Sequence, residues 1–206
     1  MLNEKIKVAV LVGGGGTNLQ AILDAAERGE IENGTISLVV SGKAGAYALE
    51  RAKNHNVPAV TCDRKSYETQ EAFEEAILTA LHNNGIGLVV LAGFMWILSA
   101  DFLKKLGCKV INVHPSLIPS FCGEGFYGLR VHEAALAYGV KVSGATVHFV
   151  NEIPDGGKII MQKAVDIVDG DTPETLQKRI MEQAEWKLLP AATEMLCKKL
   201  RQGETL

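Results

Sequence analysis

The 206-residue sequence lacks the features of several protein classes. Its longest apolar stretch, residues 88–98, is about half the length that is needed to cross a bilayer. The N-terminus carries an acidic residue and has no apolar core before its glycines, unlike a signal peptide. With 21 basic and 24 acidic residues, the chain has no excess of positive charge such as nucleic-acid-binding domains carry. We therefore expect a cytoplasmic protein that binds neither a membrane nor a nucleic acid.

Cysteine is also scarce. The four cysteines, Cys62, Cys108, Cys122 and Cys197, form no C-x-x-C pair and have no histidine at metal-ligand spacing. This pattern argues against a structural zinc site and against a disulfide framework, so we expect reduced thiols and no metal. The apolar and charged fractions, 47% and 22%, are those of an ordinary globular protein, and the length fits one domain.

Short apolar runs alternate with segments of helical periodicity over the first half of the chain. We predict strands at 6–12, 36–40, 59–62, 88–92 and 109–113, and helices at 17–28, 46–54, 69–83 and 100–106. Because these strands are apolar throughout, the sheet should be parallel and covered on both faces. The expected fold is α/β, with a Rossmann-like, mostly parallel sheet and helices on both faces.

The pattern becomes more irregular after Pro115. We predict a loop at 116–128, a helix at 131–138, strands at 142–150 and 159–168, and a long helix at 174–200 that bends at Pro190. This last third is expected to add an antiparallel strand. We interpret residues 1–206 as a single domain, in which residues 6–115 form a parallel, nucleotide-binding half.

Four consecutive glycines, Gly13 to Gly16, separate the first predicted strand from the first helix. Glycine permits positive φ and lets backbone N–H groups approach a ligand, and the helix N-terminus adds a positive dipole end. The loop therefore predicts a phosphate site, with a plain tight turn as the alternative. No P-loop lysine follows, and Asn18 and Leu19 stand where G-x-G-x-x-G requires glycine. A single phosphate monoester fits better than NAD or ATP.

Asn112 and His114 lie two residues apart at the end of a predicted parallel strand. Their side chains should project together at the sheet edge where α/β proteins bind ligands. An amide and an imidazole side by side suit an oxyanion that develops on a carbonyl carbon, and His114 could also move protons. The alternative is a half-buried polar pair that only ends a strand.

A carboxylate near His114 would raise the pKa of the imidazole and favour its charged form. The candidate is Asp155, which precedes two glycines in the predicted turn at 151–157, although a plain turn is the alternative. We interpret His132 and His148 as structural, while the two-residue phase that His148 shares with Thr146 would let it face the site.

Several segments, taken together, resemble the phosphoribosylglycinamide formyltransferase family of purine synthesis. They are residues 10–20 with the glycine loop, 89–99, 111–119 with Asn-Val-His-Pro-Ser-Leu, 144–150, and Asp-Gly-Gly at 155–157, in the family's order. The Asn-x-His-Pro-Ser-Leu block is typical of folate-dependent formyltransferases as a group. The glycine loop that ends in Thr-Asn, with the short chain, indicates the glycinamide branch.

The resemblance implies an enzyme that transfers a formyl group from 10-formyltetrahydrofolate to the primary amine of 5-phosphoribosylglycinamide (glycinamide ribonucleotide), on the route to IMP. The amine would attack directly, without a covalent enzyme intermediate. Asn112 and protonated His114 would stabilise the oxyanion, and Asp155 would raise the pKa of His114.

The resemblance also implies the binding residues. The ribonucleotide would contact Gly16, Thr17, Asn18 and Glu185, and the folate would contact Met95, Trp96, Ile97, Leu98, Val110 and Asn112. Residues 116–206 would complete the folate site and the sheet. The implied partners are these small molecules, and the implied state is a monomer or weak homodimer. Trp96 and Gln70 depart from the family, which often has basic residues there to meet the glutamate tail of the folate.

Two alternatives remain open at this point. Methionyl-tRNA formyltransferase and formyltetrahydrofolate deformylase share the Asn-x-His-Pro-Ser block, but each carries a further domain that we do not expect here. A Rossmann-type nucleotide-binding regulatory or redox domain would belong to a different class, and the interrupted glycine fingerprint argues against it.

Overall fold

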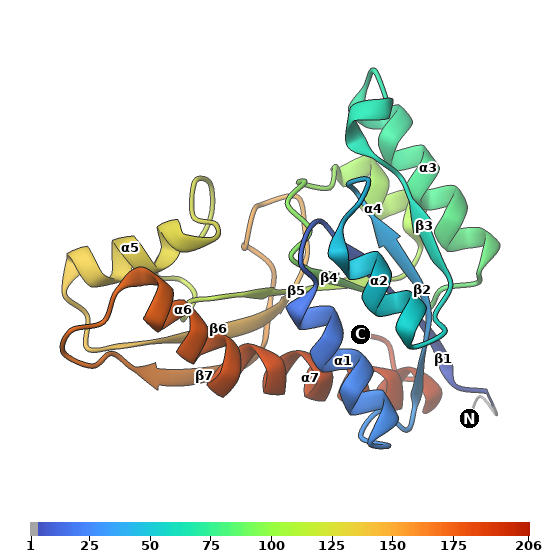
Figure 1. Ribbon diagram of the computed structural model, residues 1–206. Coiled ribbons are helices and arrows are strands. Elements are labelled where there is room, and N and C mark those ends of the chain that lie inside the picture. Colours follow the sequence, from blue (N-terminus) through green and yellow to red (C-terminus); the bar gives the residue numbers. More distant parts are fainter. Residues whose placement is uncertain (1–3) are drawn as a thin grey trace.

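The computed structural model describes residues 4–206 and has a seven-stranded sheet with helices on both faces (Figure 1). In sequence order the strands are β1 (Ile6–Val12), β2 (Gly34–Ser41), β3 (Ala59–Thr61), β4 (Leu88–Ala92), β5 (Lys109–His114), β6 (Val142–Phe149) and β7 (Ile159–Asp166). Their spatial order is β3-β2-β1-β4-β5-β6-β7. The strands β3, β2, β1, β4 and β5 run parallel to one another, and β6 is antiparallel to both of its neighbours, β5 and β7. The predicted fold class is confirmed.

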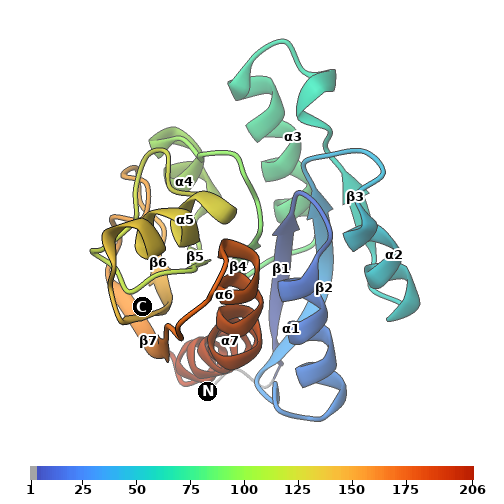
Figure 2. The same cartoon turned by 60° about the vertical axis from the view of Figure 1, so that its left-hand side comes forward.

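The helices form two layers. They are α1 (Thr17–Glu27), α2 (Tyr47–Asn54), α3 (Gln70–Asn83), α4 (Ala100–Leu106), α5 (Leu129–Tyr138), α6 (Pro173–Ile180) and α7 (Trp186–Arg201), with a 3-10 turn η1 (Arg64–Ser66) and a π-helical turn η2 (Met181–Glu185). Helices α1, α6 and α7 pack on one face of the sheet, and α3 and α4 pack on the other (Figure 2). No helix within residues 4–206 is both long enough and apolar enough to cross a membrane.

Strand β1 explains why both faces need a helical layer. Val8, Val10 and Val12 point into the core under α1 and α7, and Ala9 and Leu11 point into the core under α3. All five side chains are fully buried. Burying a valine or leucine stabilises the fold by roughly 1.5–3 kcal/mol, so a strand that is apolar throughout gains from both layers.

Strand order brings three segments of the sequence to one edge of the sheet. Val12 at the end of β1 pairs with Ala92 at the end of β4, and Leu91 of β4 pairs with Asn112 of β5. The glycine loop, the segment 93–98 and His114 therefore follow the carboxyl ends of neighbouring parallel strands. Ligands bind at this edge in open α/β sheets.

The two antiparallel pairings complete the surroundings of β5. Strand β6 places Thr146 opposite His114 and His148 opposite Asn112. The turn between β6 and β7 packs tightly against β6, because a Cβ on Gly157 would lie 1.7 Å from the carbonyl oxygen of Phe149. Glycine at position 157 thus lets residues 150–158 turn back over the sheet.

The last helical segment differs from the prediction. The helix is interrupted at η2, where the Trp186 N–H donates to the carbonyl oxygen of Met181, five residues earlier. This π-type bond accommodates one extra residue in a helical turn. Pro190, at which we expected the bend, lies inside α7, and the helix continues past it to Arg201.

Candidate active site

The centre of the site is a contact between His114, the last residue of β5, and Asp155 in the β6–β7 turn. His114 Nδ1 lies 3.3 Å from Asp155 Oδ2, and both side chains are largely buried. The Asp155 backbone has a φ of 55°, in the left-handed region, which aspartate adopts more readily than most residues. The Gly123 N–H donates to Asp155 Oδ2 at 2.9 Å. The structure thus brings together two residues that the sequence places 41 positions apart.

Asn112 and His148 extend this cluster across the β5–β6 pairing. Asn112 Nδ2 lies 3.3 Å from His148 Nε2, which in turn lies 3.5 Å from Asp155 Oδ1. His148 Nδ1 donates to the Phe149 carbonyl oxygen at 2.9 Å, so its Nε2 is the atom that faces the cluster. Sequence reasoning interpreted His148 as structural and missed these contacts. The signal was its strand phase with Thr146.

Both ring nitrogens of His114 face oxygen atoms. Nε2 donates to the Phe121 carbonyl oxygen at 2.8 Å, and Nδ1 faces Asp155. A doubly protonated ring would therefore have an acceptor for each N–H. The chain after His114 is held by Thr146, whose hydroxyl donates to the Ser116 carbonyl oxygen at 2.7 Å and accepts from the Ile118 N–H at 3.1 Å.

Burial and charge oppose each other at His114. Burial lowers the pKa of the ring, the Asp155 carboxylate and the Phe121 carbonyl raise it, and His148 lowers it further. The net pKa of His114 lies below the ordinary value for histidine, although Asp155 raises it as predicted. The carboxylate acts in the predicted direction, but the loss of solvation outweighs it.

Asp155 remains a carboxylate in spite of its own partial burial. Burial would raise its pKa, but the hydrogen bond with His148, the charge of His114 and the Gly123 N–H together hold the pKa below its usual value. The cluster therefore presents a fixed negative charge beside a neutral amide and a histidine that can take up a proton.

The conformation of the glycine loop requires a glycine at position 16. Gly16 caps α1 with a φ of 73°, and a Cβ there would lie 2.7 Å from the Cβ of Ala48 on α2. Thr17 begins α1 and is exposed. The first N–H groups of a helix have no partner within it, so this end of α1 can donate to an anion.

Asn18 and Glu185, both predicted to contact the ribonucleotide, lie in contact beside this loop. Asn18 Nδ2 donates to Glu185 Oε2 at 2.7 Å, which joins the first turn of α1 to the end of η2. Burial raises the pKa of Glu185 to about 7, and the hydrogen bond from Asn18 opposes this rise. The carboxyl is thus poised between its neutral and charged forms near neutral pH.

The segment predicted to bind folate divides into exposed and buried residues. Met95 and Ile97 are 56% and 60% exposed and flank the turn after β4, whereas Leu98 and Val110 are buried in the core. Gln70 Nε2 donates to the Ile97 carbonyl oxygen at 3.0 Å and so holds the turn in place. Of these four residues, only Met95 and Ile97 expose an apolar side chain at the surface.

Trp96 lies between the exposed pair and packs inward. Its ring centroid is 5.0 Å from that of Phe94 and 5.8 Å from that of Phe73. It covers the backbone at the ends of β1 and β2, where a Cβ on Gly42 would collide with the indole ring and one on Gly13 would contact it tightly. The Trp96 ring therefore packs directly beside the glycine loop.

One further group of side chains has the composition of a metal site. Asp24, Glu27 and His55 place their ligand atoms within 4.8 Å of one another. His55 Nδ1 lies 2.7 Å from Glu27 Oε1, and Asp24 Oδ1 accepts from Gln20 Nε2. The group lies between α1 and the end of α2 and shares no residue with the His114–Asp155 cluster.

Comparison with known proteins shows which family this chain belongs to. The family described as formyl transferase matches residues 6–193, which include every member of the cluster around His114. A phosphoribosylglycinamide formyltransferase of Haemophilus influenzae is 40% identical over 89% of this chain and 84% of its own length. This chain belongs to the phosphoribosylglycinamide formyltransferase family.

Other family members differ in length. The trifunctional purine biosynthetic protein adenosine-3 of Gallus gallus is 43% identical over 94% of this chain, but the match spans only 18% of that protein. Among solved structures, glycinamide ribonucleotide transformylase 1 of Symbiobacterium toebii has a TM-score of 0.88 and 40% identity, covering 96% of this chain and 90% of its own. The fold and the strand order around the site are therefore those of the family.

Proposed function

We propose that the chain transfers the formyl group of 10-formyltetrahydrofolate to the primary amine of glycinamide ribonucleotide, as a step of purine biosynthesis. The observation that carries the proposal is the 3.3 Å contact between His114 and Asp155, next to Asn112, in a member of this formyltransferase family. An amide donor and a protonatable ring can stabilise the oxyanion that forms in acyl transfer between two amines, and a fixed carboxylate can help to move the proton.

In the proposed reaction the amine of the ribonucleotide attacks the formyl carbon directly. A new C–N bond forms, and the formyl oxygen takes up negative charge in a tetrahedral intermediate. Asn112 Nδ2 and protonated His114 donate to this oxygen. The bond from the formyl carbon to the folate nitrogen then breaks, and a water held by Asp155 carries the proton from the attacking amine to the leaving nitrogen.

The lowered pKa of His114 is compatible with this role. The developing oxyanion supplies a second negative charge beside Asp155, so the charged form of the ring becomes more favourable as the reaction proceeds. His114 Nε2 is bonded to the Phe121 carbonyl in the structure. If Nε2 is the donor to the oxyanion, this bond must be exchanged for one to substrate, while Nδ1 keeps facing Asp155.

The two substrates would approach the cluster from neighbouring strand ends. The ribonucleotide phosphate would lie at Gly16, Thr17 and Asn18, with Glu185 accepting from a ribose hydroxyl. The pterin would lie against Met95 and Ile97, with Asn112 at the reactive end. An apolar surface beside backbone polar groups suits a flat, polar-edged ring.

The test is a formyl-transfer assay that offers glycinamide ribonucleotide and water as competing acceptors. We expect formylglycinamide ribonucleotide as the product, and we expect His114→Ala to lower kcat by about 10²–10⁴-fold with little change in ribonucleotide binding. Release of formate without formylation of the ribonucleotide would indicate a deformylase instead. Unchanged turnover in His114→Ala would remove this residue from the mechanism.

A further inference from the structure

The proposed phosphate site has a deficit of positive charge. A phosphate monoester carries between one and two negative charges near neutral pH, whereas a helix N-terminus supplies roughly half a positive charge. Gly16, Thr17 and Asn18 are uncharged, and Glu185 is acidic. A cation from another element would therefore be expected to complete the site.

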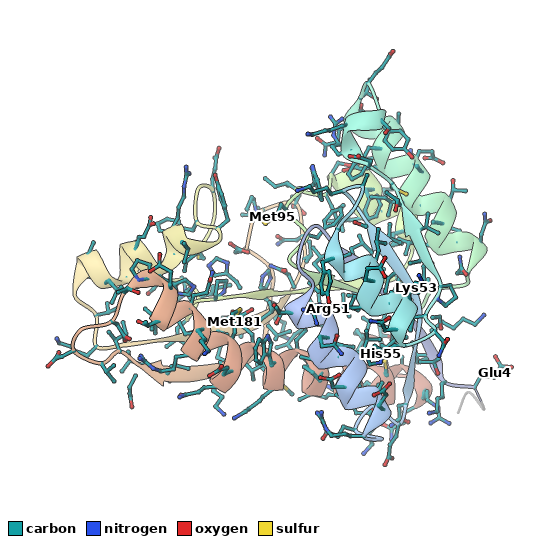
Figure 3. The ribbon with its side chains drawn as sticks, viewed as in Figure 1. Glu4, Arg51, Lys53, His55, Met95 and Met181 are labelled. Carbon is teal, nitrogen blue, oxygen red and sulfur yellow. The ribbon has the colours of Figure 1, made fainter. Side chains whose placement is uncertain are left out.

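Arg51 of α2 is positioned beside this loop. Its Nε donates to the Gly15 carbonyl oxygen at 2.8 Å, and its Nη1 donates to Gln20 Oε1, on the first turn of α1, at 2.8 Å. Figure 3 shows Arg51 and Met181 on opposite sides of the N-terminal end of α1, and Met181 Sδ lies 4.0 Å from Thr17 Oγ1. The guanidinium thus borders the turn that the phosphate would contact.

Packing holds Arg51 and the glycine loop together. The Ala48 N–H donates to the Gly14 carbonyl oxygen at 3.1 Å, and the close approach of Ala48 leaves no room for a side chain at Gly16. Arg51 also stacks over the Tyr47 ring, with its guanidinium carbon 5.0 Å from the ring centroid. The side chain is therefore ordered before any ligand binds, which lowers the entropy lost on binding.

The guanidinium keeps a donor group that no protein acceptor occupies among the described residues. Within residues 4–206, Arg51 Nη2 has no protein acceptor, while Nε and Nη1 are occupied. Arg51 and Thr17 line the same cavity, which has a volume of about 400 Å³. Two other cations and two carboxylates also line it, namely Arg28, Lys187, Asp24 and Glu182. In the part of the chain that the structure describes, none of these four side chains forms a hydrogen bond or ion pair with the glycine loop, whereas Arg51 does. An anion at the start of α1 would find these free N–H groups at the border of that cavity.

We propose that Arg51 is a further binding residue for the phosphate monoester of the substrate. It bridges the Gly15 carbonyl and Gln20 through two donors and offers Nη2 to a phosphate oxygen, so that α2 contributes the cation that the loop and α1 lack. The proposal rests on the proposed function, since that function places the ribonucleotide phosphate at this loop.

The charge of Arg51 is tested with Arg51→Gln and the conservative Arg51→Lys. A charge-assisted hydrogen bond is worth about 1.5–3 kcal/mol, so Arg51→Gln should raise the KM for glycinamide ribonucleotide by roughly 10–150-fold, with kcat near that of the wild type. Arg51→Lys should recover part of the loss, because it keeps the charge but not the fork. The matched control is Lys53→Gln, which removes an exposed positive charge from the same helix and should leave KM unchanged.

A purely structural role for Arg51 is separated by comparing ribose 5-phosphate with ribose in calorimetry, without folate. The wild type should prefer the phosphorylated sugar, and Arg51→Gln should lose most of that preference. A preference retained in Arg51→Gln, or no preference in the wild type, would overturn the proposal. These binding outcomes do not depend on catalysis, whereas failure of the proposed function would appear as absent formyl transfer in the wild type.

Discussion

Opposing effects set the pKa of His114. Burial and the neighbouring His148 lower it, and the Asp155 carboxylate raises it. Because Asp155 raises the pKa of His114 against the effect of burial, Asp155→Asn should lower that pKa further. If the protonated ring is the active form, activity is lost as pH rises through this pKa, so the alkaline limb of the kcat profile should move to lower pH in the variant. The measurement is kcat between about pH 5 and about pH 9 for both proteins. An alkaline limb at the same pH in both would argue against the pairing.

Glu185, a residue of the proposed ribonucleotide site, should also make the stability of the fold depend on pH. Its folded pKa of about 7 lies above the ordinary 4.5, so its protonated form is favoured by folding. Below the unfolded pKa, Glu185 makes its full contribution to the free energy of unfolding. This contribution of about 3 kcal/mol is lost as pH rises from about 4.5 through about 7. Glu185→Gln, which is always neutral, should remove this dependence.

Urea unfolding at several pH values checks the prediction for Glu185. The wild type should lose stability relative to Glu185→Gln as pH rises through this window, and the two should converge below it. Parallel stability curves for the two proteins would show that Glu185 does not titrate with a raised pKa.

At the scale of elements, the turn between β4 and α4 can pack against the end of β2 because Gly42 has no side chain. A Cβ on Gly42 would lie 2.3 Å from the Trp96 ring, which is held by Phe73 and Phe94. Gly42→Ala should therefore destabilise the protein by about 1–3 kcal/mol, the usual cost of overpacking. Gly14→Ala is the matched control, since a Cβ there meets no atom within 4 Å. Equal denaturation midpoints for the two variants would contradict this account.

Sequence patterns predicted the regular elements well, because local patterns determine them. The strands that are buried on both faces were confirmed, and so was α3, whose cap Thr69 accepts from the Ala72 N–H. The π-helical turn η2 was not predicted. A proline is visible in a sequence, whereas a π-turn reflects how α6 and α7 both pack on the sheet, and no local pattern reports that.

At the scale of the whole molecule, the order of the strands determines which segments meet at the carboxyl edge of the sheet, and so which ligands can bind there. The proposed site combines a phosphate loop after β1 with a proposed formyl-transfer cluster after β5, so one ligand should engage both. Glycinamide ribonucleotide should raise the melting temperature through mass action, by about 2.7 kcal/mol of stabilisation at a hundred times its dissociation constant. NAD at the same concentration should leave the melting temperature unchanged. Stabilisation by NAD would favour the nucleotide-binding alternative.

The sequence by itself determined the α/β class, the glycine loop and the position of Asn112 and His114 at the end of one strand, since each depends on residues that are close together in the chain. Only the tertiary structure decided that Asp155 and His148 join them, that Asn18 meets Glu185, and that Arg51 borders the glycine loop. It also decided the sign of the pKa shift at His114, because the loss of solvation depends on how completely the surrounding segments enclose the ring.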